Sequence, residues 1–87
     1  MHATQKIFAL ISEAASLPEN FDLTAQTPIR EVPGWDSFAW ISIITGIEQY
    51  CGSDFPIDRV DELHMVGDLI SITQGILLSQ EANRGSK

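Results

Sequence analysis

The residues of this 87-residue chain that could do chemistry are Asp36 and Ser37, which follow a Pro33-Gly34 pair. A Pro-Gly pair interrupts regular structure, and an apolar helical pattern starts directly after it. Asp36 and Ser37 are therefore predicted at the N-cap and first turn of a helix. There, unpaired backbone N–H groups and the helix dipole favour an anion beside the Ser37 hydroxyl. Capping alone explains most Asp-Ser pairs, so the surrounding sequence has to decide between a capping role and a chemical role for this pair.

Other residues offer little for catalysis or metal binding. The single cysteine, Cys51, cannot form an internal disulfide, which fits a reducing compartment. With two distant histidines, His2 and His64, it makes no plausible metal cluster. No nucleophile–base pair and no pair of buried carboxylates can be assembled from the sequence. We therefore expect neither a metal site nor an enzyme.

The charge balance is acidic, with five Lys and Arg against twelve Asp and Glu and a net charge of −7. Such a chain repels nucleic acid and anionic lipid and is attracted to basic protein surfaces. Acidity that only keeps a small domain soluble explains the composition equally well. No run approaches the ~18 apolar residues of a membrane span, and the N-terminus does not read as a signal peptide. We expect a monomeric, cytoplasmic domain over residues 1–80 with a frayed tail over 81–87.

Helical periodicity predicts an all-α fold. A first helix is expected over residues 4–16, with Thr4 as its cap and Pro18 as its stop. Residues 17–36 contain three prolines and no clear period, and we expect an ordered crossover. Its apolar side chains can hold it to the core: Phe21, Leu23, Ile29, Val32 and Trp35.

The second half of the chain predicts three more helices. The second runs from Ser37 to about Cys51, a short third piece capped by Asp58 ends at Leu63, and the last runs from about Val66 to Ser79. The expected fold is a four-helix bundle with three long helices, a short third helix and a long first loop.

The second helix has an unusual distribution of side chains. Its predicted buried arc consists of Trp40, Ile43, Ile44, Ile47, Tyr50 and Cys51. The opposite, polar arc also holds Phe38, with Ile41 at its border. Phe38 either folds under the preceding loop or contacts a partner that approaches Ser37. Gly46 lies on the polar arc too, at a cost of about 1 kcal/mol against Ala for which the sequence gives no reason.

Four segments together resemble the acyl carrier proteins: Gly34-Trp35-Asp36-Ser37-Phe38, Ile47-Glu48-Gln49-Tyr50-Cys51, Phe55-Pro56 and Val66-Gly67-Asp68-Leu69. In that family, Asp-Ser-Leu opens the second helix, and Leu-Glu-Glu-x-Phe, Ile-Pro and Val-Gly-Asp follow at similar intervals. The correspondence has no gap from Gly34 to about Ile70, and it covers the first helix only loosely. It implies a four-helix bundle of the acyl-carrier type.

The resemblance also implies a carrier function. Ser37 would receive 4′-phosphopantetheine from coenzyme A, and Asp36 would assist the phosphopantetheinyl transferase. The thiol of the arm would hold an acyl group as a thioester, so the reactive chemistry belongs to the cofactor. A phosphodiester at a helix N-terminus gains about 0.3–1 kcal/mol from the dipole. Acyl-loading and acyl-transferring enzymes with basic docking patches would be the partners, in a specialised lipid or secondary-metabolite pathway rather than in general fatty acid biosynthesis.

Departures from the family pattern concern the docking face. Positions that usually bear acids on the second helix read Ala39, Ser42, Glu48 and Gln49, and negative charge lies instead at Asp54, Asp58, Asp61 and Glu62. We therefore expect docking to rely on net charge for steering and on apolar side chains for contact. The predicted partner-binding residues are Phe38, Ile41, Ser42, Glu48, Asp58, Asp61 and Glu62.

A second departure concerns the cargo. Trp40 and Leu69 stand where the family often has smaller residues near the acyl chain, and extra volume in a packed core must displace something. Either Trp40 simply repacks the core, or the acyl cavity is reduced and the cargo is short, polar, aromatic or held outside. The predicted lining of the acyl cavity is Trp40, Ile44, Val60, Leu63 and Leu69.

Two other functions are compatible with this fold. A peptidyl or aryl carrier of a nonribosomal assembly line would use the same Ser37 with a different cargo. An unmodified helical adaptor would have lost the arm, but it would have no need for an intact Asp36-Ser37 pair.

Overall fold

Three α-helices and two short 3-10 helices make up the fold of this computed structural model, which describes the backbone of residues 2–85 and the side chains of residues 3–80. The order is α1 (His2–Ala14), η1 (Ile29–Glu31), α2 (Ser37–Cys51), η2 (Ile57–Glu62) and α3 (Val66–Gly85). Within residues 2–85 there is no strand, only an isolated bridge between Pro28 and Met65. The predicted all-α class is confirmed, with three long helices, a short helix before the last and a long first loop.

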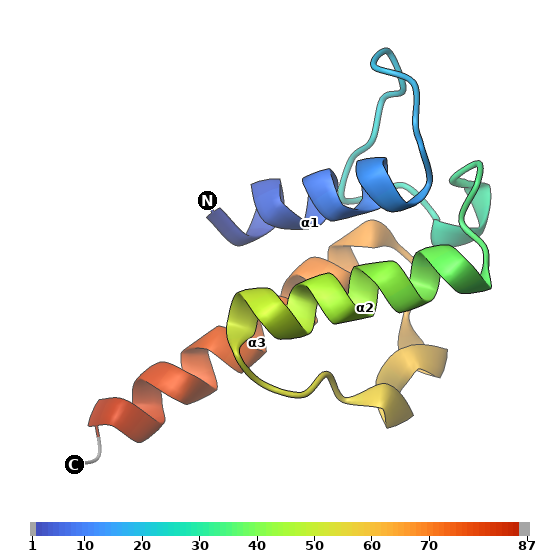
Figure 1. Cartoon of the computed structure of the whole chain (residues 1–87). Helices are drawn as coiled ribbons and strands as arrows, with labels where there is room; N and C mark the ends of the chain where they lie inside the picture. The colour runs from blue at the N-terminus through green and yellow to red at the C-terminus, as the bar shows by residue number, and fades with distance from the viewer. Residues whose placement is uncertain (1, 86–87) are drawn as a thin grey trace.

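The helices lie side by side along much of their length. In Figure 1, α2 runs back past α1 in the opposite direction, and α3 passes behind α2 and extends beyond it. The long first loop and η2 lie at the other end of the molecule from the start of α1 and the end of α3. Among the described residues, no helix combines the length and apolarity needed to cross a membrane.

The core takes one apolar face from each α-helix. Its fully buried apolar side chains are Ile7, Ile11, Ile43, Ile47, Val66 and Leu69. Burial of each such side chain contributes roughly 1.5–3 kcal/mol. Thr73 is also fully buried, and its hydroxyl donates a hydrogen bond of 2.8 Å to the Leu69 carbonyl, so the core contains this polar group without leaving it unpaired.

α2 begins and ends where the sequence predicts. Asp36 is its N-cap, and the Asp36 Oδ1 atom accepts a hydrogen bond of 2.9 Å from the Ala39 N–H. Gly52 is its C-cap and donates its N–H to the Glu48 carbonyl at 2.7 Å. Both ends of the helix are therefore set by a specific capping residue.

The other helix boundaries differ from the prediction. α1 spans His2–Ala14 rather than 4–16, so Thr4 is inside the helix and not its cap. It ends early because Ser16 adopts a left-handed conformation with φ of 53°, which cannot continue an α-helix. η2 starts at Ile57 with Pro56 as its N-cap, so Asp58 lies in its first turn and is not its N-cap.

α3 is longer than predicted. It continues past Ser79 to Gly85, so the backbone of residues 81–85, assigned by the sequence to a frayed tail, is helical. Residues 86–87 of that tail lie outside the described residues.

The long first loop is held to the core and to the start of α3. Ile29 and Val32 are buried, Leu23 and Trp35 pack half-buried against the core, and Phe21 is half-buried outside the core cluster. The loop also forms backbone hydrogen bonds with the start of α3. These are Ile29 N–H to the His64 carbonyl (2.9 Å), Val66 N–H to Thr27 (3.0 Å) and Gly67 N–H to Ala25 (2.8 Å). The predicted ordered crossover is thereby confirmed.

Two glycines permit close packing around α1. Gly34 has φ of +81°, and a Cβ there would lie 2.5 Å from the Ala15 carbonyl oxygen at the end of α1. A Cβ at Gly46 would collide with the Leu10 side chain. Gly46 is therefore half-buried in the α1–α2 contact, which supplies the reason that the sequence did not give for a glycine inside this helix.

Candidate functional site

Ser37 is the first residue of α2, and its side chain is exposed. In the described part of the chain, no group accepts a hydrogen bond from the backbone N–H of Ser37 or of Phe38. One oxygen of the exposed Asp36 carboxylate, Oδ1, caps the Ala39 N–H. Ser37 therefore presents a hydroxyl to solvent beside two available N–H donors at the positive end of the helix dipole.

Ala39 and Trp40 fix the direction in which Ser37 points. Ala39 is only 1% exposed, so it belongs to the buried row of α2 and not to the docking face on which the family resemblance placed it. Trp40 is half-buried against the core. Because these two residues face inward, the first residue of the helix is turned outward.

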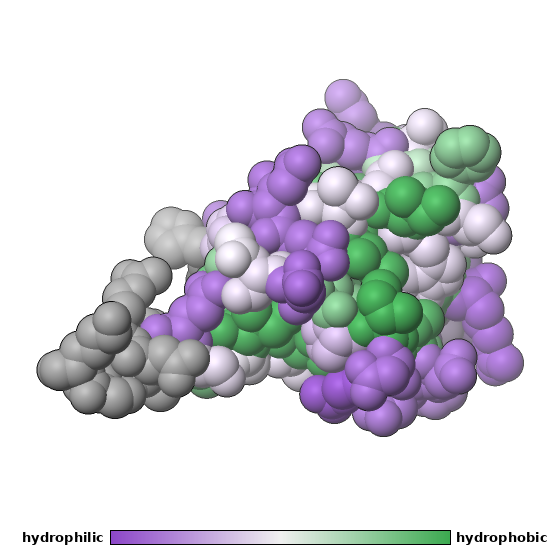
Figure 2. All heavy atoms as spheres, turned by 60° about the horizontal axis from the view of Figure 1, so that its bottom comes forward, coloured by the Kyte–Doolittle hydropathy of each residue, from purple (hydrophilic) through white to green (hydrophobic). Residues whose placement is uncertain are grey.

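Large apolar side chains stand next to Ser37 on the surface. Phe38 is 81% exposed and Ile41 is 63% exposed, so Phe38 does not fold under the preceding loop. Ser42 is exposed on the same helix, and Ile57 of η2 is exposed as well. Figure 2 views the molecule from below and shows hydrophobic side chains in a broken band between hydrophilic ones. This arrangement can contact a partner with apolar side chains at the centre of its docking surface.

Glu48, predicted as a partner-binding acid, has a partner inside the protein. It is half-buried, and its Oε2 atom accepts a hydrogen bond of 3.0 Å from the Phe55 N–H. Phe55 is itself buried at 3% exposure. The Glu48 carboxylate therefore holds the connection between α2 and η2, a role that its position on the polar arc did not indicate.

The other predicted acids lie on η2. Asp58, Asp61 and Glu62 are all exposed, and Glu62 pairs with Arg59 at 3.3 Å between Oε1 and Nε. An exposed pair of this kind contributes only about 0.2–1 kcal/mol. In Figure 1, η2 lies at the same end of the molecule as the start of α2, so these acids share one end with Ser37.

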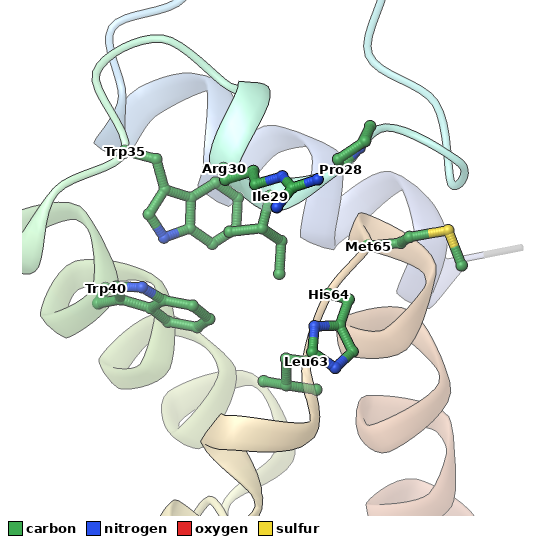
Figure 3. Close-up of a pocket in the computed structure, with 8 residues that line it drawn as sticks. All are labelled: Pro28, Ile29, Arg30, Trp35, Trp40, Leu63, His64 and Met65. Atoms are coloured by element: carbon green, nitrogen blue, oxygen red, sulfur yellow. The ribbon is translucent and has the colours of Figure 1, made fainter.

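A half-open groove of about 630 Å³ lies beside the start of α2. Figure 3 shows its walls, which come from the first loop with η1, from α2, and from the connection between η2 and α3. We call it the tryptophan groove, and it is lined by Pro28, Ile29, Arg30, Trp35, Trp40, Leu63, His64 and Met65.

All five residues predicted to line an acyl cavity belong to the core cluster or pack against it, but only two of them line the tryptophan groove. Trp40 and Leu63 line the tryptophan groove, whereas Ile44 and Val60 are half-buried against the core. Leu69 is fully buried within the core. The remaining groove residues were not predicted, because they come from loop segments without a periodic pattern.

The two tryptophans form one wall of the groove. Their ring centroids are 5.0 Å apart, with an interplanar angle of 70°, which is a favourable edge-to-face arrangement. The Trp35 Nε1 atom is buried and has no hydrogen-bond partner among the described residues. In Figure 3 this nitrogen lies on the edge of the ring that faces Trp40.

Asp68 fixes the opposite wall. Its Oδ2 atom accepts hydrogen bonds from the backbone N–H groups of Met65 (2.9 Å) and His64 (2.8 Å), directly before α3. These two bonds, first that from Met65 and then that from His64, hold the pKa of the Asp68 carboxyl below its ordinary value. Asp68 lies in the first turn of α3 and therefore ties the segment directly before this helix to its start.

Two further classes of site have no support in the described residues. Burial raises the pKa of the Cys51 thiol, which makes the thiolate, the reactive form, scarcer. Within the same residues, no three His, Cys, Asp or Glu side chains are grouped so that they could hold a metal ion.

Comparison of the chain with protein-family models, with curated proteins and with solved structures gives no match.

Proposed function

We propose that this chain is a carrier protein in which the Ser37 hydroxyl is the attachment point for 4′-phosphopantetheine. The proposal depends on one observation, the exposed hydroxyl of Ser37 at the first position of the 15-residue helix α2. When bound, the arm supplies a thiol that holds an acyl group as a thioester. The sequence motifs that resemble the acyl carrier proteins support the same assignment.

The residues at the start of α2 suit a phosphodiester. The anion would lie beside the unpaired N–H groups of Ser37 and Phe38, which donate to it, and the helix dipole adds about 0.3–1 kcal/mol. In the attachment step, Ser37 Oγ forms a bond to phosphorus while the pyrophosphate bond of coenzyme A breaks. Adenosine 3′,5′-bisphosphate leaves, and the serine proton passes to a base of the transferase. Asp36 keeps the first turn in place and presents a carboxylate to that enzyme.

The surface around Ser37 suits docking to partner enzymes. The net charge of −7 attracts basic surfaces over a distance, and the exposed acids of η2 lie at the same end of the molecule as Ser37. Phe38 and Ile41 then provide the apolar contact. The expected partners are a phosphopantetheinyl transferase and enzymes that load or remove an acyl group through a basic docking patch.

The test is covalent loading. The purified chain is incubated with coenzyme A, Mg²⁺ and a broad-specificity phosphopantetheinyl transferase, and its intact mass is measured. We expect the wild type and Thr45→Ala, which removes another exposed hydroxyl of α2, to gain one arm, and Ser37→Ala to gain none. If the folded wild type gains no mass, or if Ser37→Ala still does, the proposal is wrong. An unmodified adaptor with the same fold would give the first of these results.

A further inference from the structure

We infer that the tryptophan groove holds the acyl group carried on Ser37, and that it selects an aromatic acyl group with an acidic substituent. This inference rests on the proposed function and adds the class of cargo. This site differs from the interior of the bundle, where Ile43, Ile47 and Leu69 are fully buried.

The position of the groove allows it to receive a group attached at Ser37. Two of its residues flank the serine, with Trp35 two positions before it and Trp40 three positions after it. Three residues correspond to a rise of about 4.5 Å along a helix, so the attachment point lies near the edge of the groove. A flexible arm on Ser37 can fold back over this short distance.

The shape and the tryptophan wall favour an aromatic group. A volume of about 630 Å³ is within the usual range of small-molecule sites. Trp35 and Trp40, already packed edge to face, offer further ring faces and edges to a third ring. Leu63 and Ile29 provide apolar contacts on the other sides.

The polar residues of the groove favour an acidic substituent. Arg30 is exposed and forms no ion pair with any described residue, although the chain is strongly acidic. Figure 3 shows its guanidinium along the upper rim and the His64 imidazole on the lower right, with the groove between them. A guanidinium binds a carboxylate through two parallel hydrogen bonds, and an imidazole can donate another. An uncharged aliphatic chain would bind neither the Arg30 guanidinium nor the His64 imidazole.

The experiment loads Ser37 with three different groups and follows the groove directly. The transferase is supplied with 4-carboxybenzoyl-, benzoyl- or octanoyl-coenzyme A, and the intact mass confirms each product. Tryptophan emission then reports the groove, because the only two tryptophans of the chain are both in its wall. The rate of thioester cleavage by hydroxylamine, divided by the rate for the same thioester on coenzyme A, measures protection.

We expect 4-carboxybenzoyl to change the emission and to be protected most, and octanoyl to be protected least. Arg30→Gln should speed cleavage of the 4-carboxybenzoyl thioester about two- to fivefold, the effect of one solvent-exposed charge pair, and leave benzoyl unchanged. Arg59→Gln is the matched control, because it removes the same charge from η2, and it should change neither rate. Circular dichroism confirms that both variants are folded.

Other outcomes overturn the inference. Loading of Ser37 with no change in emission and no protection means that the groove does not hold the cargo, while the carrier function stands. If the octanoyl thioester is protected most, or if Arg30→Gln and Arg59→Gln have equal effects, the groove does not select an acidic aromatic acyl group. Absence of any loading refutes the carrier function and this inference with it.

Discussion

The clearest structural prediction concerns Glu48, whose carboxylate accepts a hydrogen bond from the buried Phe55 N–H. In Glu48→Ala this N–H loses its partner, and an unsatisfied buried donor costs about 1–3 kcal/mol. The bond is only partly buried, so we take the lower part of that range, about 1–2 kcal/mol. In a domain of this size, 1 kcal/mol lowers Tm by roughly 4–8 °C, so we expect a decrease of about 5–15 °C.

Glu48→Gln separates the hydrogen bond from the charge. The amide oxygen can still accept from Phe55, but a neutral hydrogen bond has about half the strength of a charge-assisted one. We therefore expect Glu48→Gln to lose about half as much stability as Glu48→Ala. Gln49→Ala, at the exposed neighbouring position, should leave Tm nearly unchanged.

Thermal unfolding followed by circular dichroism measures all three variants under the same conditions. If Glu48→Ala is as stable as Gln49→Ala, the hydrogen bond does not stabilise the connection between α2 and η2, and Glu48 is available for docking. If Glu48→Gln is as unstable as Glu48→Ala, the negative charge is what matters and not the acceptor atom.

Three further outcomes are expected. Backbone hydrogen bonds hold the pKa of Asp68 below its ordinary 3.8, so its stabilisation is complete above that pH and is lost as the pH falls through the native pKa. Asp68→Asn should therefore lower Tm at pH 7 and approach the wild type as the pH falls below the native pKa of Asp68; a pH-independent difference contradicts this. Gly46→Ala should raise the free energy of unfolding by about 1 kcal/mol, through helix propensity, only when Leu10 is also changed to Ala. Urea unfolding measures the effect of Gly46→Ala in the wild type and in Leu10→Ala. Equal gains in the two backgrounds would refute the contact between Gly46 and Leu10. Phe38→Ala should lower kcat/KM of an acyl-transferring partner about fivefold or more, and Glu48→Gln much less; equal losses would mean that the apolar contact is not the main one.

The sequence was most informative where a capping residue marks a helix end. α2 was predicted with the correct bounds because Asp36 and Gly52 are both strong capping signals. α1 has no such signal at its end, since the left-handed residue is a serine and not a glycine. α3 was predicted too short because its apolar pattern stops near Leu78, while polar residues continue the helix.

The candidate site was only partly predictable. The exposed position of Ser37 follows from its place directly behind a cap, which local sequence determines. The partner of Glu48 and the tryptophan groove depend on contacts between segments far apart in the chain. Arg30 and His64, for example, face the same groove although 34 positions separate them in the sequence. Periodicity contains no information on such pairs.

The hydrogen bonds between the first loop and the start of α3 affect the free energy of placing a ligand in the tryptophan groove. They join residues 25–29 to residues 64–67, so most of the wall opposite the tryptophans is fixed before any ligand arrives. A preformed wall spares a ligand much of the entropy that ordering a loop would consume, so modest contacts can suffice for binding. Any widening of the groove should then come from the side of Trp35 and the first turn of α2. The amides of Ile29 and Val66 are expected to exchange their hydrogens slowly and together.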